Sequence, residues 1–291
     1  MISIQYAILA SGGLGTVCTE IIVQQQQVSF VMTDKNSIAI IELCRQKNIP
    51  CFVGNPRKGK ATAFLSDLNT DVILSINYLF IVENDIISLP TKYAINLHGS
   101  LLPRYRGRTP HVWAIINNEK ETGITAHLMT EGCDEGDIVY QEKIDIRPEE
   151  TGAGILGIFN EQYPLIVQRL MNMITNNQIQ PQSQEHSKAT YFEKRTPDDG
   201  GINWEWQKER IYNWVRAQAK PYPGAFAFKG ADKITINQLN YSDQGYHNDM
   251  PNGLVLKNGK QPIVKTPNGA VILTDFVLPD GVTLLEGDIL K

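Results

Sequence analysis

Short apolar runs alternate with helical patterns along the first half of the chain. Near-continuous apolar runs separated by helices are typical of strands buried on both faces of a parallel sheet. The pattern predicts strands over residues 6–10, 28–32, 50–53, 71–76 and 93–97. It predicts helices over residues 38–47 and 61–68, and a helix that follows the turn Ser11–Gly15 and ends near Gln25.

This alternation predicts an α/β fold with a Rossmann-like, doubly wound and mostly parallel sheet, because crossovers between parallel strands are right-handed. In such a sheet ligands bind at the carboxyl ends of the strands. Two further strands are predicted over residues 123–129 and 138–146. Thr151 then opens a helix whose apolar residues recur at nearly 3.6-residue spacing as far as Ile174.

The last hundred residues have a different pattern. Residues 176–188 are polar and rich in Gln and Ser, which predicts a boundary between an N-terminal domain, 1–188, and a linker with a C-terminal domain, 189–291. A helix is predicted over 206–218, followed by strands over 225–228, 234–239, 253–256, 263–266 and 270–276. Asn-Gly pairs at 258–259 and 268–269 are tight-turn signals. Five short strands predict a small β-barrel of the oligonucleotide-binding (OB) type.

Composition narrows the class of protein. The 291 residues are 42% hydrophobic and 20% charged, with no stretch apolar enough to span a membrane. No basic segment precedes the apolar start Met1–Gln5, which favours a first core strand over a secretory signal. The net charge of −4 counts against a dedicated nucleic-acid binder. Cys18, Cys44, Cys51 and Cys133 form no C-x-x-C pair, so we expect reduced cysteines in a cytoplasmic protein.

The candidate chemistry centres on Asn96 and His98, two positions apart at the end of a predicted strand. Strand side chains alternate, so both polar groups project from one face. Asp134 completes the set from a later loop. A histidine beside a carboxylate can act as a general acid or base, and an amide can polarise a carbonyl, which indicates transfer of an acyl-type group. The structural alternative is a buried histidine satisfied by its neighbours, with Asn96 closing a turn.

Two further segments are candidate binding sites. Ser11-Gly12-Gly13-Leu14-Gly15 resembles part of a phosphate-cradling turn but lacks the G-x-G-x-x-G spacing; close helix packing is the alternative. Arg104, Arg106 and Arg108 either clamp substrate phosphates or lie on a solvated loop. Among His98, His111 and His127 there is no short metal-ligand spacing, so no metal site is predicted.

The run Asn96-Leu97-His98-Gly99-Ser100-Leu101-Leu102-Pro103-Arg104-Tyr105-Arg106-Gly107, together with Asp134, resembles the formyltransferase family that uses N10-formyltetrahydrofolate. Glycine after the histidine is similar to the methionyl-tRNA and sugar-nucleotide branches. The segments Ile211–Ala217 and Pro221–Ala225 resemble the start of the C-terminal domain of those two branches.

The resemblance implies that a substrate amine attacks the formyl carbon of N10-formyltetrahydrofolate. Asn96 and protonated His98 then stabilise the oxyanion, and Asp134 orients His98 and accepts a proton. The implied folate-binding residues are Tyr78, Leu79, Phe80, Glu131, Cys133 and Asp137. The candidate substrate-binding residues are Ser11, Gly12, Gly13, Ser100, Arg104, Arg106 and Arg108.

Three hypotheses follow for the function. The favoured one is a sugar N-formyltransferase acting on a dTDP- or UDP-linked amino sugar for surface-polysaccharide (O-antigen or lipopolysaccharide) synthesis. Homodimers are common among the similar sugar enzymes, so a homodimer is one expectation. The second is a methionyl-tRNA formyltransferase and the third a non-catalytic binding module. The tRNA enzymes carry a basic insertion after the second strand, whereas here Val31–Ser37 runs straight into a helix. From Gln207 onward the chain has ten Lys and Arg residues and eight Asp and Glu residues. A domain that binds tRNA phosphates is expected to have a larger basic surplus.

Overall fold

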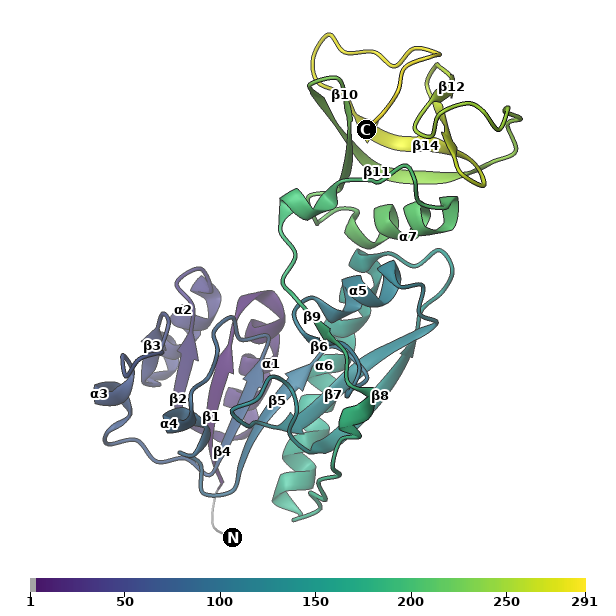
Figure 1. The fold of residues 1–291 in the computed structure, drawn as a ribbon. Helices are drawn as coiled ribbons and strands as arrows, with labels where there is room; N and C mark the ends of the chain where they lie inside the picture. The colour runs from purple at the N-terminus through teal and green to yellow at the C-terminus, as the bar shows by residue number, and fades with distance from the viewer. Residues whose placement is uncertain (1–3) are drawn as a thin grey trace. The chain divides into compact units, whose positions relative to one another are not determined.

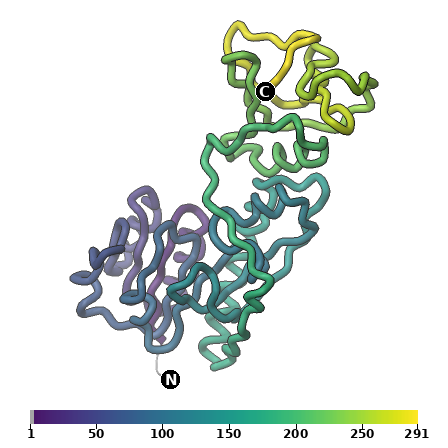
Figure 2. The backbone as a smooth tube through the Cα atoms, in the orientation of Figure 1, coloured from purple at the N-terminus to yellow at the C-terminus, as the bar shows by residue number. Residues whose placement is uncertain are grey.

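The computed structural model describes residues 4–291; Met1–Ser3 of the apolar start lie outside the described residues. The chain divides into two compact units, each assembled from several segments (Figure 2). The first unit contains the chain up to Gly107, Gly123–Ile144 and Ile158–Tyr191. The second contains Arg108–Thr122, Asp145–Gly157 and Phe192–Lys291. No helix within residues 4–291 is long and apolar enough to cross a bilayer.

A seven-stranded sheet in the order β3-β2-β1-β4-β5-β7-β8 forms the first unit (Figure 1). Neighbouring strands among the first five are parallel, and β7 runs antiparallel to β5. The predicted α/β, mostly parallel doubly wound fold is confirmed. The strands are β1 (Gln5–Ala10), β2 (Gln27–Thr33), β3 (Cys51–Val53), β4 (Val72–Ile76), β5 (Tyr93–His98), β7 (Glu121–Leu128) and β8 (Ile138–Asp145).

Helices flank this sheet in Figure 1. They are α1 (Gly12–Gln25), α2 (Ile38–Lys47), α3 (Thr62–Leu65), α4 (Asn84–Ile87) and α6 (Gly152–Thr175). One core face joins alternate strand residues, such as Leu9 and Met32, to Leu65 of α3 and Ile86 of α4. The helix predicted over 61–68 is only one turn long, because Leu65 is the one buried residue within α3 and little packing supports a longer helix.

The order of the strands creates a topological switch point next to β1, at the carboxyl edge of the sheet. β2 and β3 lie on one side of β1, and β4 and β5 lie on the other. Ala10 pairs with Ile76, and Ile76 pairs with Leu97. Ser11 and Asn77, which directly follow β1 and β4, therefore lie at the level of His98, the last residue of β5. This is the edge where doubly wound sheets bind ligands.

The second unit is built on a five-stranded antiparallel sheet in the order β10-β11-β14-β13-β12. Its strands are β10 (Ala225–Lys229), β11 (Asp232–Ser242), β12 (Val255–Lys257), β13 (Ile263–Thr266) and β14 (Gly269–Val277). Helix α7 (Lys208–Gln218) packs on β11 and on α5 (Pro110–Ile116), with Ile211 and Ile236 fully buried. The predicted C-terminal β domain is confirmed as a half-barrel.

Residues 287–291 connect the two edge strands of this half-barrel. Leu290 N donates to Gly253 O at 2.9 Å, and Val255 N donates to Asp288 O at 2.8 Å. At the other edge, Lys291 N donates to Phe228 O at 2.8 Å. Backbone hydrogen bonds therefore run from β12 through this segment to β10, which covers both sheet edges.

Several short elements were not predicted from the sequence. They are α4, α5, the two-residue strands β6 (Arg106–Gly107) and β9 (Tyr191–Phe192), and the 3₁₀ helices η1 (His186–Lys188) and η2 (Pro197–Gly200). β6 and β9 form a two-stranded ribbon in which Arg106 N donates to Thr190 O at 2.8 Å. Elements this short carry no measurable hydrophobic period, so the pattern of apolar residues does not reveal them.

Candidate active site

Asn96 and His98 on β5 reach the same carboxylate. Asn96 Nδ2 lies 3.5 Å from Asp134 Oδ1, and His98 Nδ1 lies 3.5 Å from Asp134 Oδ2. His98 is 7% exposed, and Asn96 is half-buried. The structure therefore brings together the three residues that the sequence singled out as catalytic.

One ring nitrogen of His98 is held by backbone. Nε2 lies 2.7 Å from the carbonyl oxygen of Tyr105, and because a carbonyl only accepts, Nε2 carries the proton. Nδ1 is then left to face Asp134. Burial lowers the pKa of His98 below its usual value, although the Asp134 charge and the Tyr105 carbonyl oppose this. The resting imidazole is thus biased toward its neutral form.

Asp134 lies in the loop between β7 and β8, at a backbone φ of +52°. Gly107 N–H donates to its Oδ2 at 2.9 Å. Burial disfavours the carboxylate, but His98, His127 and the Gly107 N–H outweigh that cost and hold the pKa of Asp134 well below its usual range. Asp134 is therefore ionised at neutral pH and suited to stabilise positive charge.

His127 on β7 joins this group, although the sequence pattern pointed to no catalytic role for it. It is the register partner of Asn96 and is 3% exposed. Its Nε2 lies 3.2 Å from Asn96 Nδ2 and 3.4 Å from Asp134 Oδ1, and its Nδ1 lies 2.8 Å from Leu128 O. With Nδ1 donating to Leu128 O, Nε2 lies within reach of both the Asn96 amide and the Asp134 carboxylate.

The glycine-rich turn lies at the carboxyl end of β1. Gly12 has φ +66°, and its N–H donates to Ser37 Oγ at 2.8 Å. A Cβ on Gly15 would lie 3.1 Å from that of Ala10, so Gly15 serves close packing of helix on strand. Ser11 is 1% exposed, whereas a Cβ on Gly13 would meet open space. Contact with substrate stays a prediction for Ser11, Gly12 and Gly13.

Asn77 is a second residue that the sequence did not single out. It follows β4 with φ +52°, and its Nδ2 donates to Ser11 O at 3.0 Å. The side chain thereby ties the end of β4 to the turn after β1, across the switch point. An asparagine in the left-handed region directly after a buried strand is a weak sequence signal for such a site.

The three arginines separate into two kinds. Arg106 is fully buried and donates to Tyr191 Oη at 2.6 Å and to Gln184 Oε1 at 2.7 Å. Its guanidinium is engaged inside the fold, whereas Arg104 and Arg108 are exposed. Ser100, 1% exposed, donates its hydroxyl to Arg104 O at 2.8 Å and so shapes the loop. Binding of substrate phosphates by Arg104 and Arg108 stays a prediction.

The implied folate-binding residues line the loops after β4 and β7. Tyr78 and Phe80 form an edge-on ring pair with centroids 5.5 Å apart, and Leu79 is 45% exposed. The buried Tyr78 hydroxyl has no hydrogen-bond partner among the described residues, and burial raises its pKa. Apolar surface beside an unpartnered hydroxyl fits an aromatic ring that carries polar edges. Glu131 and Cys133 are exposed and Asp137 is half-buried on the other loop.

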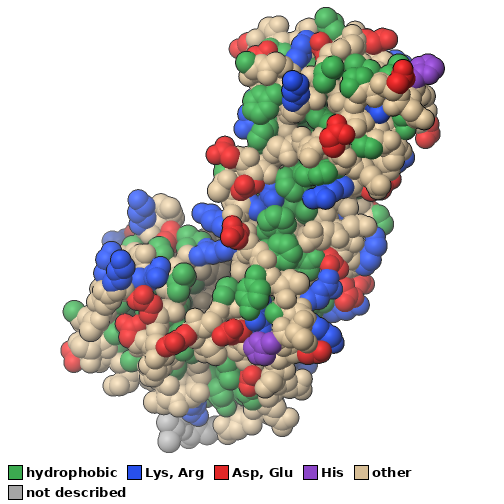
Figure 3. All heavy atoms as spheres, viewed as in Figure 1, with side chains coloured by type: hydrophobic (Ala, Val, Ile, Leu, Met, Phe, Trp, Pro, Cys, Tyr) green, Lys and Arg blue, Asp and Glu red, His purple; other side chains and the backbone are tan. Residues whose placement is uncertain are grey.

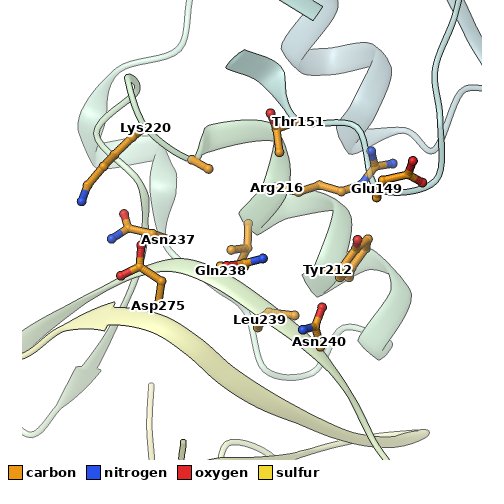
Figure 4. A pocket seen from close by; sticks show the side chains of 12 residues that line it. Glu149, Thr151, Tyr212, Arg216, Lys220, Asn237, Gln238, Leu239, Asn240 and Asp275 are labelled. Atoms are coloured by element: carbon orange, nitrogen blue, oxygen red, sulfur yellow. The ribbon is translucent and has the colours of Figure 1, made fainter. Parts of the chain in front are cut away.

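The second unit has a pocket of its own, with a volume of about 300 Å³ (Figure 4). Side chains from α7 and β11 line it, among them Tyr212, Arg216, Asn237 and Asn240. No residue that the sequence singled out for catalysis or binding lines this pocket. The candidate catalytic residues belong to the first unit.

The family described as formyl transferase matches residues 7–162, and the family described as formyl transferase, C-terminal domain, matches residues 194–285. The chain belongs to the formyl transferase family. The predicted family resemblance is confirmed.

The chain is also similar to part of a longer curated protein. It is 39% identical over 183 residues to the bifunctional polymyxin resistance protein ArnA of Wigglesworthia glossinidia brevipalpis, a match that covers 63% of this chain and 28% of that protein. The chain thus spans well under half the length of this curated relative.

Solved structures share the fold. An N-formyltransferase from Helicobacter canadensis, complexed with folinic acid and dTDP-3-aminofucose, superposes with a TM-score of 0.72 at 20% identity, over 94% of this chain and 99% of that one. WlaRD, a sugar 3N-formyl transferase solved with dTDP and 5-N-formyl-THF, gives 0.70 at 18% identity, over 94% and 98%. Methionyl-tRNA formyltransferase from Clostridium thermocellum gives 0.59 at 18%, over 96% and 100%.

Proposed function

We propose that this protein transfers the formyl group of N10-formyltetrahydrofolate to the amine of a nucleotide-linked amino sugar. The observation that carries the proposal is the convergence of Asn96 and His98 on Asp134 at the carboxyl edge of the sheet, with both ring-nitrogen distances fixed by the fold. Formyl transfer needs an amide donor for the developing oxyanion, a proton acceptor for the attacking amine and a fixed negative charge beside them.

The geometry assigns these roles to separate groups. The amine attacks the formyl carbon, and the carbonyl oxygen becomes an oxyanion that accepts from Asn96 Nδ2. His98 Nδ1, neutral and facing Asp134, takes the proton that the amine loses, and Asp134 stabilises the imidazolium. The bond from the formyl carbon to N10 of the folate then breaks as N10 takes that proton back from the His98 imidazolium. Asp134 is a weak base because its pKa is depressed, which favours His98 as the proton acceptor.

The loop after β4 is the proposed binding site for the folate co-substrate. The proposal assigns the pteridine to the loop after β4, where Tyr78, Leu79 and Phe80 offer apolar surface and a buried hydroxyl without a partner. Folinic acid and 5-N-formyl-THF in the two sugar-enzyme complexes support a folate co-substrate. N10-formyltetrahydrofolate supplies the formyl group, and the protein supplies position and charge.

Three observations favour an amino-sugar nucleotide over methionyl-tRNA. Two sugar formyltransferase structures give TM-scores of 0.72 and 0.70, whereas the tRNA enzyme gives 0.59. Residues 34–37 alone connect β2 to α2, which leaves no room for a basic insertion. On the face drawn in Figure 3, the Lys and Arg side chains of the second unit lie among acidic and apolar ones rather than in a basic stripe.

A substrate panel tests the proposal. The purified protein is incubated with N10-formyltetrahydrofolate and dTDP- or UDP-linked sugars that carry a 3- or 4-amino group, dTDP-3-aminofucose among them. We expect at least one sugar to gain the mass of a formyl group, and methionyl-tRNA in a parallel reaction to stay unmodified. Formylated methionyl-tRNA with no modified sugar would reverse the choice of substrate. The cytoplasmic location, the homodimer and the surface-polysaccharide role stay predictions.

A further inference from the structure

Gln184 contacts the catalytic loop from a segment that the sequence pattern assigned to a polar domain boundary. The side chain is 5% exposed. Its Nε2 donates to the carbonyl oxygen of Asp134 at 2.9 Å and to that of Gly136 at 2.7 Å. Both amide hydrogens of Gln184 are therefore committed to the backbone on either side of Glu135, next to the carboxylate that faces His98.

Arg106 determines which way this amide points. Its Nη2 and Nε lie 2.7 Å and 3.3 Å from Gln184 Oε1. A guanidinium has donors only, so Oε1 has to face Arg106 and Nε2 has to face the loop. Tyr191 Oη, 2.6 Å from Nη1, and Glu135 Oε2, 3.9 Å from Nη1, hold the other end of the fork.

The residues on either side of Arg106 bind the same catalytic pair directly. Tyr105 O holds His98 Nε2 at 2.7 Å, and Gly107 N–H holds Asp134 Oδ2 at 2.9 Å. The loop has little freedom beyond Asp134, since a Cβ on Gly136 would lie 1.9 Å from Leu128 O. Tyr105 thus holds the His98 imidazole, and Gly107 holds the Asp134 carboxylate. Arg106, between them, holds the backbone of Asp134 through Gln184.

We propose that Gln184, oriented by Arg106, is a positioning residue that holds the Asp134 loop so that the carboxylate stays in reach of His98. Gln184 touches no reacting atom in this account and acts through the loop. The kinetic part of the test rests on the proposed function, so a second measurement needs no substrate.

The kinetic test replaces the side-chain nitrogen of Gln184 with oxygen. Gln184→Glu keeps an oxygen for Arg106 but removes the donor to Asp134 O and Gly136 O. We expect kcat to fall about tenfold to a hundredfold, the range for a misplacement of about 1 Å, with KM changed less than about threefold. Gln218→Glu is the matched control: Gln218 is 6% exposed, accepts from Arg195 at 2.8 Å and donates to Trp214 O at 2.9 Å, within the second unit. Its kcat should stay within about twofold.

The second measurement follows the His98 titration by NMR in the free protein. The groups that face His98 are Asp134, His127 and the Tyr105 carbonyl, and the Asp134 charge raises its pKa. Gln184→Met removes the donors without adding charge, so a displaced carboxylate should lower the pKa of His98 by about half a pH unit or more. An unchanged titration together with an unchanged kcat in Gln184→Glu would overturn the proposal. If the wild type formylates no amine, the titration alone decides it.

Discussion

Two arginine–glutamine pairs, each with a buried glutamine, show what distinguishes the reactive region from the rest of the molecule. Arg106 with Gln184 lies in the first unit, and Arg195 with Gln218 lies in the second. Both glutamines are more than nine-tenths buried, accept from a guanidinium and donate to backbone carbonyls. A buried glutamine that bridges a guanidinium and the backbone is therefore common to both regions.

The difference lies in what each pair holds. Gln218 donates to Trp214 O within helix α7, which stabilises architecture alone. Gln184 donates to the loop that carries Asp134, a carboxylate 3.5 Å from one imidazole and 3.4 Å from another. A buried charge with a displaced pKa beside other titratable groups is the feature that marks chemistry.

The largest effect is expected from Asp134→Asn. The amide keeps the shape but removes the charge that stabilises a protonated His98, so kcat should fall by about 10²–10⁴, the range for acid–base groups. Steady-state kinetics with the amino-sugar nucleotide measure it. Asp288→Asn removes a carboxylate that pairs with Lys229 at 2.7 Å in the second unit, and it should leave kcat nearly unchanged. Equal rates in wild type and Asp134→Asn would remove Asp134 from the mechanism.

Asn96→Ala should have the next largest effect. It removes the amide donor proposed for the oxyanion, and one such donor is worth about 10²–10³ in kcat. Because His127 Nε2 then loses its partner 3.2 Å away, Asn96→Asp is an informative companion: it restores a polar group without the N–H. Recovery of activity in Asn96→Asp would show that donation from this position is dispensable.

Acid should destabilise the first unit through the same groups. The pKa of Asp134 is depressed in the folded state, so its contribution is complete above the unfolded value of about 4 and is lost as the pH falls further. The lowered pKa of His98 acts in the same direction below about pH 6.5. Urea unfolding between pH 2 and 5, at pH values spaced by about half a unit, should show a loss on the order of 2 kcal/mol in wild type that Asp134→Asn lacks. Parallel pH curves would contradict this.

The smallest effect concerns the exposed arginines. If Arg104 and Arg108 clamp substrate phosphates, replacing both with Ala should raise KM for the sugar nucleotide about tenfold or less and leave kcat nearly unchanged. Lys220→Ala, which removes an exposed cation that lines the pocket of the second unit, is the control. An unchanged KM in the double variant would place phosphate binding on other residues.

The sheet of each unit could be predicted from the sequence because its strands have strong apolar patterns. β13 coincides with the predicted range 263–266, and each of the other long strands begins and ends within a few residues of its prediction. α5, which Pro110 opens, was not predicted because it follows an arginine-rich loop and spans only seven residues. The two-residue strands β6 and β9 depend on tertiary pairing and have no local signal.

The same limit applies to the site. Asn96 and His98 share one face of one strand, so their spacing alone places them together. Asp134 was found through its motif. His127 and Asn77 require the order of the strands, and Gln184 requires the path of a polar segment, neither of which apolar periodicity encodes.

The most direct test of the account follows an isotopically labelled formyl group from N10-formyltetrahydrofolate onto dTDP-3-aminofucose and the other sugars of the panel. Wild type and Asp134→Asn are compared by NMR of the product. We expect a labelled formamide on one sugar nucleotide with wild type, and a rate of formation lower by about 10²–10⁴ with Asp134→Asn. Label on methionyl-tRNA alone, or the same rate with both proteins, would contradict it.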